Sequence, residues 1–315
     1  METPVQLGKT GILVSPLGLG TWQWGDYFVW RYGQGYADDD LRAAFERSLE
    51  AGINFIDTAE IYGRGRAERL LGEFMGSRRE GLVVATKFMP LPWRWRRRCL
   101  FRALRGSLNR LGIPSVDLYQ IHWPFRPRAV EVWADALGEA VAEGLTRAAG
   151  VSNFSADQMA RAYETLKRRG VVLASNQVEY NLLNRRIEHN GVLECCRRLG
   201  VTIIAYSPLA KGLLSGKYGP SNPPPGLRRR MFHPADLEAL QPLVGLMREI
   251  GQAHDGASPS QVALNWLLSK DVIPIPGAKN ARQAAENAAA LGWRLTGDEV
   301  KALDEASHRY AQRRR

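Results

Sequence analysis

Residues 53–62 read INFIDTAEIY, a short apolar run that ends in an acidic residue and is followed by a tyrosine. Two later stretches, 82–87 (LVVATK) and 117–122 (DLYQIH), have the same form and end in a lysine and a histidine. Short apolar runs of this kind predict buried β-strands. Because α/β barrels collect functional side chains at the carboxyl ends of their strands, we expect four polar groups to meet there. They are Asp57, Tyr62, Lys87 and His122.

Strand-like and helix-like runs alternate along most of the chain. After a hairpin formed by 5–7 and 12–14, apolar runs predict eight strands, near 17–20, 53–58, 82–87, 116–122, 146–151, 173–178, 201–206 and 272–275. Apolar residues at helical spacing predict helices at 39–51, 67–75, 97–111, 130–143, 156–169 and 187–199. Eight such units close into an α/β fold of the (β/α)8 barrel type, with extended βα loops. No linker-like stretch divides them, so we expect a single domain over 1–315.

A doubly wound nucleotide-binding sheet is the competing architecture. It needs a G-x-G-x-x-G turn after an early strand. The nearest match is 18–20 (GLG), which continues as TWQ without a third glycine. The sequence therefore excludes this fold, and any dinucleotide must be held in another way.

The net charge of +11 raises the question of a nucleic-acid partner. The basic runs lie at 94–98, 228–230 and 313–315, and no recognisable DNA- or RNA-binding motif accompanies them. We therefore expect no nucleic-acid partner. Part of this charge suits a polyanionic small molecule such as a phosphorylated cofactor.

No window approaches the ~18 consecutive apolar residues of a membrane helix, so we expect no membrane partner. The first residues lack the features of a signal peptide, and three cysteines are too few for a disulfide framework. These features favour a reducing cytoplasm. Cys195 and Cys196 are adjacent and lack metal-ligand spacing, so we expect no metal site. The sequence specifies no oligomeric state.

The four strand-end residues are suited to proton transfer. A tyrosine hydroxyl has a pKa of ~10, and a neighbouring lysine ammonium lowers that pKa by stabilising the phenolate. We expect Lys87 to act on Tyr62 in this way, Asp57 to pair with Lys87, and His122 to orient a substrate oxygen. Such a site donates a proton to a carbonyl oxygen and needs a nicotinamide cofactor as its hydride source. For any one of these residues alone, a structural ion pair or a loop cap is the simpler interpretation.

Further motifs accompany these residues along the chain: IDTAEIYG at 56–63, TK at 86–87, IHWP at 121–124, GVSNF at 150–154, AYSPL at 205–209 and IPGAKN at 275–280. Together they resemble the aldo-keto reductases, from about residue 5 to about residue 305. The resemblance is closest to bacterial and plant members that also include potassium-channel β-subunits. The segments GTWQWG at 20–25 and PWR at 92–94 resemble plant pyridoxal reductases.

The resemblance implies NADPH-dependent reduction of aldehydes and ketones to alcohols, with a catalytic tetrad of Asp57, Tyr62, Lys87 and His122 in which Tyr62 is the acid. It implies that the nicotinamide carboxamide is bound by Ser152, Asn153 and Gln177, and that Tyr206 stacks under the ring. The other residues implied at the cofactor are Gly20, Thr21, Trp22, Asp57, Ser207, Pro208, Leu209, Lys211, Gly212, Lys217, Pro276 and Gly277. Arg228 and Arg230, on the proline-rich segment 211–232, are expected either to fold over the cofactor or to form a solvated charge run.

The adenosine end is implied to lie along 275–287, where Glu286 and Asn287 match the family's adenine-contacting pair. Gln283 stands where many members carry an arginine for the 2′-phosphate. Lys279 supplies a cation in its place, and a loop at a helix N-terminus also offers backbone N–H groups to phosphate. We therefore expect NADP(H) as the cofactor.

Two loops remain for a small-molecule carbonyl substrate. The loop over 20–38 is long and dense in aromatic residues, which predicts the wall of a pocket for a flat or apolar compound. The candidates for this wall are Trp22, Trp24, Trp30, Trp93 and Trp123. The proline-rich segment 211–232 is typical of a lid. The alternative function is that of a regulatory protein of the channel β-subunit type, which senses NADPH through slow turnover. Assays of turnover on aromatic aldehydes distinguish this sensor from an enzyme.

Overall fold

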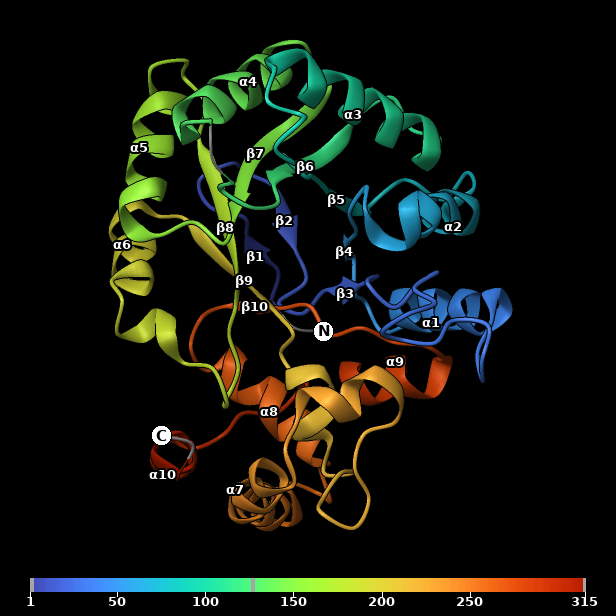
Figure 1. Cartoon of the computed structure of the whole chain (residues 1–315), viewed down its shortest axis with the longest axis vertical. Helices are drawn as coiled ribbons and strands as arrows, with labels where there is room; N and C mark the ends of the chain where they lie inside the picture. Colours follow the sequence, from blue (N-terminus) through green and yellow to red (C-terminus); the bar gives the residue numbers. More distant parts are fainter. Residues whose placement is uncertain (1–2, 126–127, 314–315) are drawn as a thin grey trace.

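Eight parallel strands form one sheet in the computed structural model, which describes residues 3–125 and 128–313 (Figure 1). The strands lie in the sheet in their order along the chain. They are β3 (Leu19–Gly20), β4 (Phe55–Asp57), β5 (Val83–Phe88), β6 (Val116–Ile121), β7 (Thr146–Ser152), β8 (Leu173–Glu179), β9 (Thr202–Tyr206) and β10 (Ile273–Pro274). The end of the basic tail, 314–315, lies outside the described residues.

The first and last strands meet and close the sheet. The backbone N–H of Gly18 donates to Pro274 O at 2.9 Å, and that of Gly20 donates to Pro276 O at 3.0 Å. A Cβ on Gly20 would lie 2.7 Å from Ile275 O, so β3 can approach this closely only without a side chain. The fold is a TIM-type barrel, and the eight expected strands are confirmed.

Helices surround the strands (Figure 1). They are α1 (Asp38–Glu50), α2 (Arg66–Met75), α3 (Arg97–Leu111), α4 (Val130–Ala142), α5 (Ala156–Lys167), α6 (Val192–Leu199), α7 (Pro234–Ala253), α8 (Pro259–Leu268), α9 (Ala281–Ala288) and α10 (Gly297–Arg313). The expected start of a helix at 187 is wrong. Ile187 lies in a 3-10 turn, η2 (Arg186–Glu188), and α6 begins only after Gly191, which has a φ of 80°.

The expected hairpin, β1 (Val5–Gln6) with β2 (Leu13–Val14), covers the amino-terminal end of the barrel. The backbone N–H of Gly8 donates to Thr202 Oγ1 at 2.7 Å, at the start of β9. Leu7 and Val14 are fully buried in the apolar layer that fills the barrel interior. This end is therefore plugged, and the carboxyl ends of the strands are left for a site.

Inward-facing side chains change from apolar to polar along β4, β5 and β6. In β4 Phe55 is followed two residues later by Asp57, in β5 Ala85 by Lys87, and in β6 Leu118 by Gln120. Residues two apart in a strand share a face, so the polar members form a layer above the apolar one. Over residues 3–125 and 128–313, no helix is long and apolar enough to cross a membrane.

Candidate active site

Lys87 and Asp57 form a fully buried ion pair at the carboxyl end of the barrel. Lys87 Nζ lies 2.5 Å from Asp57 Oδ1, 2.8 Å from Thr58 O and 3.3 Å from Tyr62 Oη. A buried ammonium needs a full set of acceptors, because its desolvation is costly. The lysine thus has an acceptor for each of its three protons, and one acceptor is the tyrosine hydroxyl.

Tyr62 opens the 3-10 turn η1 (Tyr62–Gly65), whose backbone is unusual. Gly63, Arg64 and Gly65 all have positive φ, at 54°, 55° and 83°. Strained backbone of this kind persists only where its surroundings hold it. Glu60, just before the turn, anchors this segment, because it accepts hydrogen bonds from Met89 N and from both terminal nitrogens of Arg94.

Burial and charge oppose each other at this pair. Burial raises the pKa of Tyr62, and Lys87 lowers that pKa by less, so the pKa lies above 10.0. Lys87 thus lowers the pKa of Tyr62, as expected, but burial outweighs this effect. Burial lowers the pKa of Lys87, but Asp57 and Tyr62 together raise that pKa by more, so the lysine remains charged. Near neutral pH the site holds a protonated tyrosine beside an ammonium.

His122 directly follows β6 and faces Tyr62, with the two rings edge to face at 5.8 Å. Burial, and secondarily the charge of Lys87, hold the pKa of His122 well below 6.5. The imidazole is neutral at physiological pH, and its buried Nδ1 has no hydrogen-bond partner among the described residues. It is therefore suited to hydrogen bonding with a ligand and unsuited to acting as the acid.

A cavity of about 470 Å³ opens above these residues. Asp57, Tyr62 and His122 line it, whereas Lys87 lies beneath the surface. The expected cofactor residues that line it are Gly20, Thr21, Trp22, Ser152, Asn153, Gln177, Tyr206, Ser207, Pro208, Leu209, Lys211, Gly212, Lys217, Arg228, Pro276, Gly277, Lys279, Gln283, Glu286 and Asn287. Arg230 is exposed and outside the cavity, because its neighbour Arg228 takes the inward position on the turn η4 (Gly226–Met231).

A chain of hydrogen bonds crosses the floor of the cavity. Tyr206 Oη donates to Asn153 Oδ1 at 3.0 Å, and Asn153 Nδ2 donates to His122 O at 3.1 Å. Ser152 Oγ donates to Gln177 O, and Gln177 Nε2 donates to Asp57 Oδ2 at 2.8 Å. The residues expected at the nicotinamide are thus linked to the carboxylate of the ion pair.

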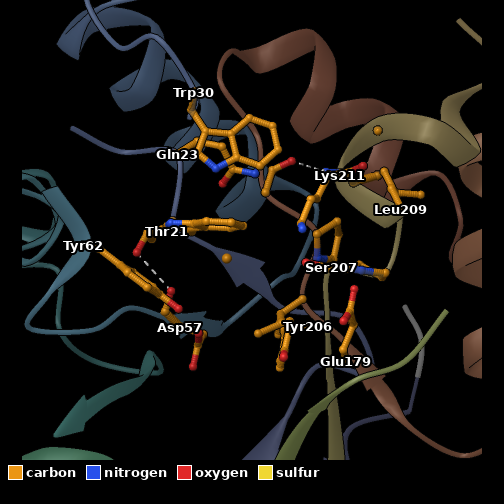
Figure 2. A pocket seen from close by; sticks show the side chains of 18 of the residues that line it. Thr21, Gln23, Trp30, Asp57, Tyr62, Glu179, Tyr206, Ser207, Leu209 and Lys211 are labelled. Atoms are coloured by element: carbon orange, nitrogen blue, oxygen red, sulfur yellow. Dashed lines mark hydrogen bonds between the residues drawn. The ribbon is translucent and has the colours of Figure 1, made fainter. Parts of the chain in front are cut away.

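Trp30, from the loop between β3 and α1, lines the cavity (Figure 2), and two cations lie near its ring. Arg228 lies 5.0 Å from its ring centroid and Lys279 lies 5.1 Å from it. Lys279 Nζ also donates to Trp30 O, and Arg228 donates to Lys211 O. Trp30 therefore joins three segments that are distant in the sequence.

Three of the five expected substrate-wall tryptophans line the cavity: Trp22, Trp30 and Trp123. The prediction for the other two is wrong. Trp24 is fully buried, where its indole N–H donates to Ala278 O and its ring packs on Phe74. Trp93 is 72% exposed and does not line the cavity.

Sequence reasoning missed several residues of the wall: Gln23, Ile61, Met89, Glu179, Ser215, Tyr218, Ser260 and Ile275. Ile61 precedes Tyr62 and Met89 follows β5 by one residue, so adjacency to the strand ends could have indicated both. Glu179 ends β8 and Ile275 directly follows β10, so the same adjacency could have indicated them. Gln23, Ser215 and Tyr218 lie in irregular or 3-10 segments and Ser260 lies on α8, where the sequence carries no such signal.

The wall opposite Tyr62 fits an anionic dinucleotide. Four of its side chains are cationic, namely Lys211, Lys217, Arg228 and Lys279. Arg228 is nine-tenths buried, and its Nε has no hydrogen-bond partner in residues 3–125 and 128–313. Ser207 and Lys211 have positive φ without being glycine, at 50° and 56°. Buried unpartnered donors and strained backbone are typical of sites built for a ligand.

Comparisons with known proteins agree with this geometry. The model of the Aldo/keto reductase family matches residues 16–308. The chloroplastic pyridoxal reductase of Arabidopsis thaliana is 42% identical, over 96% of this chain and 86% of that protein. The L-glyceraldehyde 3-phosphate reductase of Escherichia coli K12 is 33% identical, over 90% and 86%. An aldo-keto reductase of Klebsiella pneumoniae, solved with NADPH, has a TM-score of 0.78 and 28% identity, over 97% and 95%.

Proposed function

This chain belongs to the aldo/keto reductase family, and from that premise we propose that it reduces aldehydes and ketones to alcohols with NADPH, with Tyr62 as the proton donor. The observation that carries the proposal is the buried arrangement of Lys87, Asp57 and Tyr62 beneath one cavity. A hydroxyl that touches an ammonium and opens to a cavity is suited to general acid catalysis.

In the proposed reaction the bound cofactor supplies the hydride. Tyr62 Oη donates its proton to the carbonyl oxygen, and the Lys87 ammonium stabilises the phenolate that remains. Asp57 keeps Lys87 charged and fixed. Neutral His122 hydrogen-bonds the same carbonyl oxygen and sets its direction.

The preference for NADPH over NADH rests on the cations of the far wall. Lys279 lies at the amino end of α9, beside Gln283, whose Oε1 accepts from the Lys279 backbone N–H at 3.0 Å. The stretch from Gly277 to Gln283 contains no acidic residue to bind a free 2′-hydroxyl. A phosphate at this position is therefore favoured by charge.

The proposed substrates are aromatic aldehydes, and among them pyridoxal. The wall around Tyr62 is formed by Trp22, Ile61, Met89 and Trp123, which suit a flat apolar ring. Similarity to the pyridoxal reductase of Arabidopsis thaliana adds the specific candidate.

The experiment is an assay of NADPH oxidation by the purified protein with 4-nitrobenzaldehyde and with pyridoxal at millimolar concentration. We expect both to be reduced, with Tyr62→Phe as the inactive control. If only nitrobenzaldehyde reacts, pyridoxal is excluded as the substrate and the reductase proposal stands. If neither aldehyde and no ketone is reduced, the reductase proposal is wrong.

A further inference from the structure

Gln120 lies within the barrel, next to the catalytic groups, and the reaction described above gives it no role. It is fully buried on β6, in the inward-facing layer that also holds Asp57 and Lys87. Its Nε2 donates to Asp57 Oδ2 at 3.3 Å. Apolar side chains fill the layer directly beneath it, so a buried amide at this position needs hydrogen-bond partners.

The neighbours of Gln120 are arranged to receive its amide. Ser175 Oγ donates to Gln120 Oε1 at 3.4 Å, so both ends of the amide have a partner. Gly150 on β7 faces Gln120, and a Cβ at position 150 would lie 2.9 Å from Gln120 Cγ. Gly150 stands between Gln120 and Ser175 in the sheet, and because it has no side chain it leaves the space across which the long polar side chain reaches the serine.

Asp57 uses its two oxygens for different partners. Oδ1 accepts from Lys87, whereas Oδ2 accepts from the amides of Gln177 and Gln120. Gln177 lines the cavity, and under the proposed function it contacts the cofactor. Gln120 is not among the residues that line the cavity. Its hydrogen bond to Asp57 is therefore the one that a ligand does not reach.

We propose that Gln120 is a positioning residue, which holds the Asp57 carboxylate against Lys87 independently of Gln177. The expected effect on kcat rests on the proposed function, whereas the hydrogen bond between Gln120 and Asp57 is present in the protein without any ligand. The titratable groups that face the pair are Tyr62, His122, Tyr206 and, beyond Tyr206, Glu179. Gln120 lies beside Lys87 in the register of β5 and β6. Its side-chain amide, however, donates to Asp57 and accepts from Ser175, so its polar effect on the ion pair passes through Asp57.

The test compares Gln120→Met, which keeps length and removes the amide, with Tyr119→Phe as a matched control. Tyr119 is the adjacent residue on β6, fully buried, with a hydroxyl that has no partner in the described structure. For Gln120→Met we expect kcat to fall by about tenfold, with KM for the aldehyde and Kd for NADPH unchanged. The basic limb of the kcat–pH profile should move to lower pH, because a less firmly held Asp57 raises the pKa of Lys87 less. Tyr119→Phe should change none of these.

A second measurement needs no activity. Urea unfolding of Gln120→Met, Asp57→Asn and the double variant forms a double-mutant cycle, and we expect the unfolding constants to depart from additivity by about tenfold. Ser175→Ala, which frees the other end of the amide, should shift the kcat–pH profile in the same direction by less. Additive unfolding constants together with an unchanged pH profile would show that Gln120 only fills space, and would overturn the proposal. If no aldehyde is reduced by the native protein, the function fails while the cycle still decides the role of Gln120.

Discussion

At the scale of single residues, burial does as much as charge to define the site. Tyr62 is kept protonated because burial outweighs the neighbouring ammonium, whereas Lys87 is kept charged because Asp57 outweighs burial. A proton donor for carbonyl reduction must hold its proton until the transition state, so this balance suits the proposed reaction.

Replacing Tyr62 by Phe removes the proton donor and leaves the cavity wall in place. We expect kcat to fall by about 10²–10⁴-fold, while the Kd for NADPH changes by no more than about twofold. Steady-state kinetics and quenching of tryptophan fluorescence measure the two quantities. Retention of more than about a tenth of the native kcat/KM would exclude Tyr62 as the acid.

Lys279 provides the test of cofactor choice. A charge-assisted hydrogen bond to phosphate contributes roughly 1.5–3 kcal/mol, so Lys279→Ala should weaken NADPH binding by about one to two powers of ten. Binding of NADH should hardly change, because NADH has no phosphate there. Lys301→Ala, an exposed lysine on α10, is the control. Equal weakening of both cofactors, or a native preference for NADH, would contradict the assignment.

The same lysine predicts a pH dependence. Burial, with the charge of Arg228, lowers the pKa of Lys279 to about 8. The ammonium is present below that pH and is lost above it, so NADPH affinity should fall as the pH rises through about 8. A bound phosphate raises the pKa of the lysine in the complex, which spreads the decline to higher pH. Titrations of both cofactors at several pH values check this: NADH affinity, and NADPH affinity of Lys279→Ala, should lack the decline.

At the scale of elements, strands could be predicted from sequence and several helices could not. The eight strands were apparent because each is a short apolar run bounded by turn residues. α8 has eight of its ten residues buried, so it lacks the polar face that marks a surface helix. α7 carries Pro242 in its interior, which weakens the helical signal further.

The candidate site shows the same division. Asp57, Tyr62, Lys87 and His122 could be predicted because strand ends fix where their side chains point. The loop over 20–38 has no such period, so the sequence could not tell that Trp24 turns into the core while Trp22 and Trp30 line the cavity. Gln120 was missed because a glutamine within an apolar strand carries no motif of its own.

Trp30 connects its own loop to the segments that carry Arg228 and Lys279, and we expect these contacts to retain the cofactor. A cation–π contact contributes ~0.5–2 kcal/mol, so loss of the contacts to Arg228 and Lys279 in Trp30→Ala should speed NADPH dissociation by about tenfold. Phe28→Ala, on the same loop and 71% exposed, is the matched control. Stopped-flow displacement measures both rates. Equal dissociation rates for the two variants would show that Trp30 does not retain the cofactor.

At the scale of the whole molecule, the net charge of +11 and the cations of the cavity act together. Lys211 lies on the opposite side of the cavity from Tyr62 (Figure 2). The positive charges therefore favour binding of an anion on the Lys211 side, whereas the wall beside Tyr62 is apolar. A positive electrostatic field attracts an anionic cofactor toward the cavity from a distance, whereas it exerts no net attraction on an uncharged aldehyde.

This division predicts different salt dependences for the two ligands. The Debye length falls from ~30 Å at 0.01 M to ~3 Å at 1 M salt, so screening should slow NADPH association by about tenfold over that range. The kcat/KM for 4-nitrobenzaldehyde at saturating NADPH should stay nearly constant, because this aldehyde carries no net charge. Stopped-flow fluorescence gives the association rate and steady-state assays give the control. NADPH association that is independent of salt would mean that the surface charge is solvated without steering the cofactor, and that only the contacts inside the cavity determine its binding.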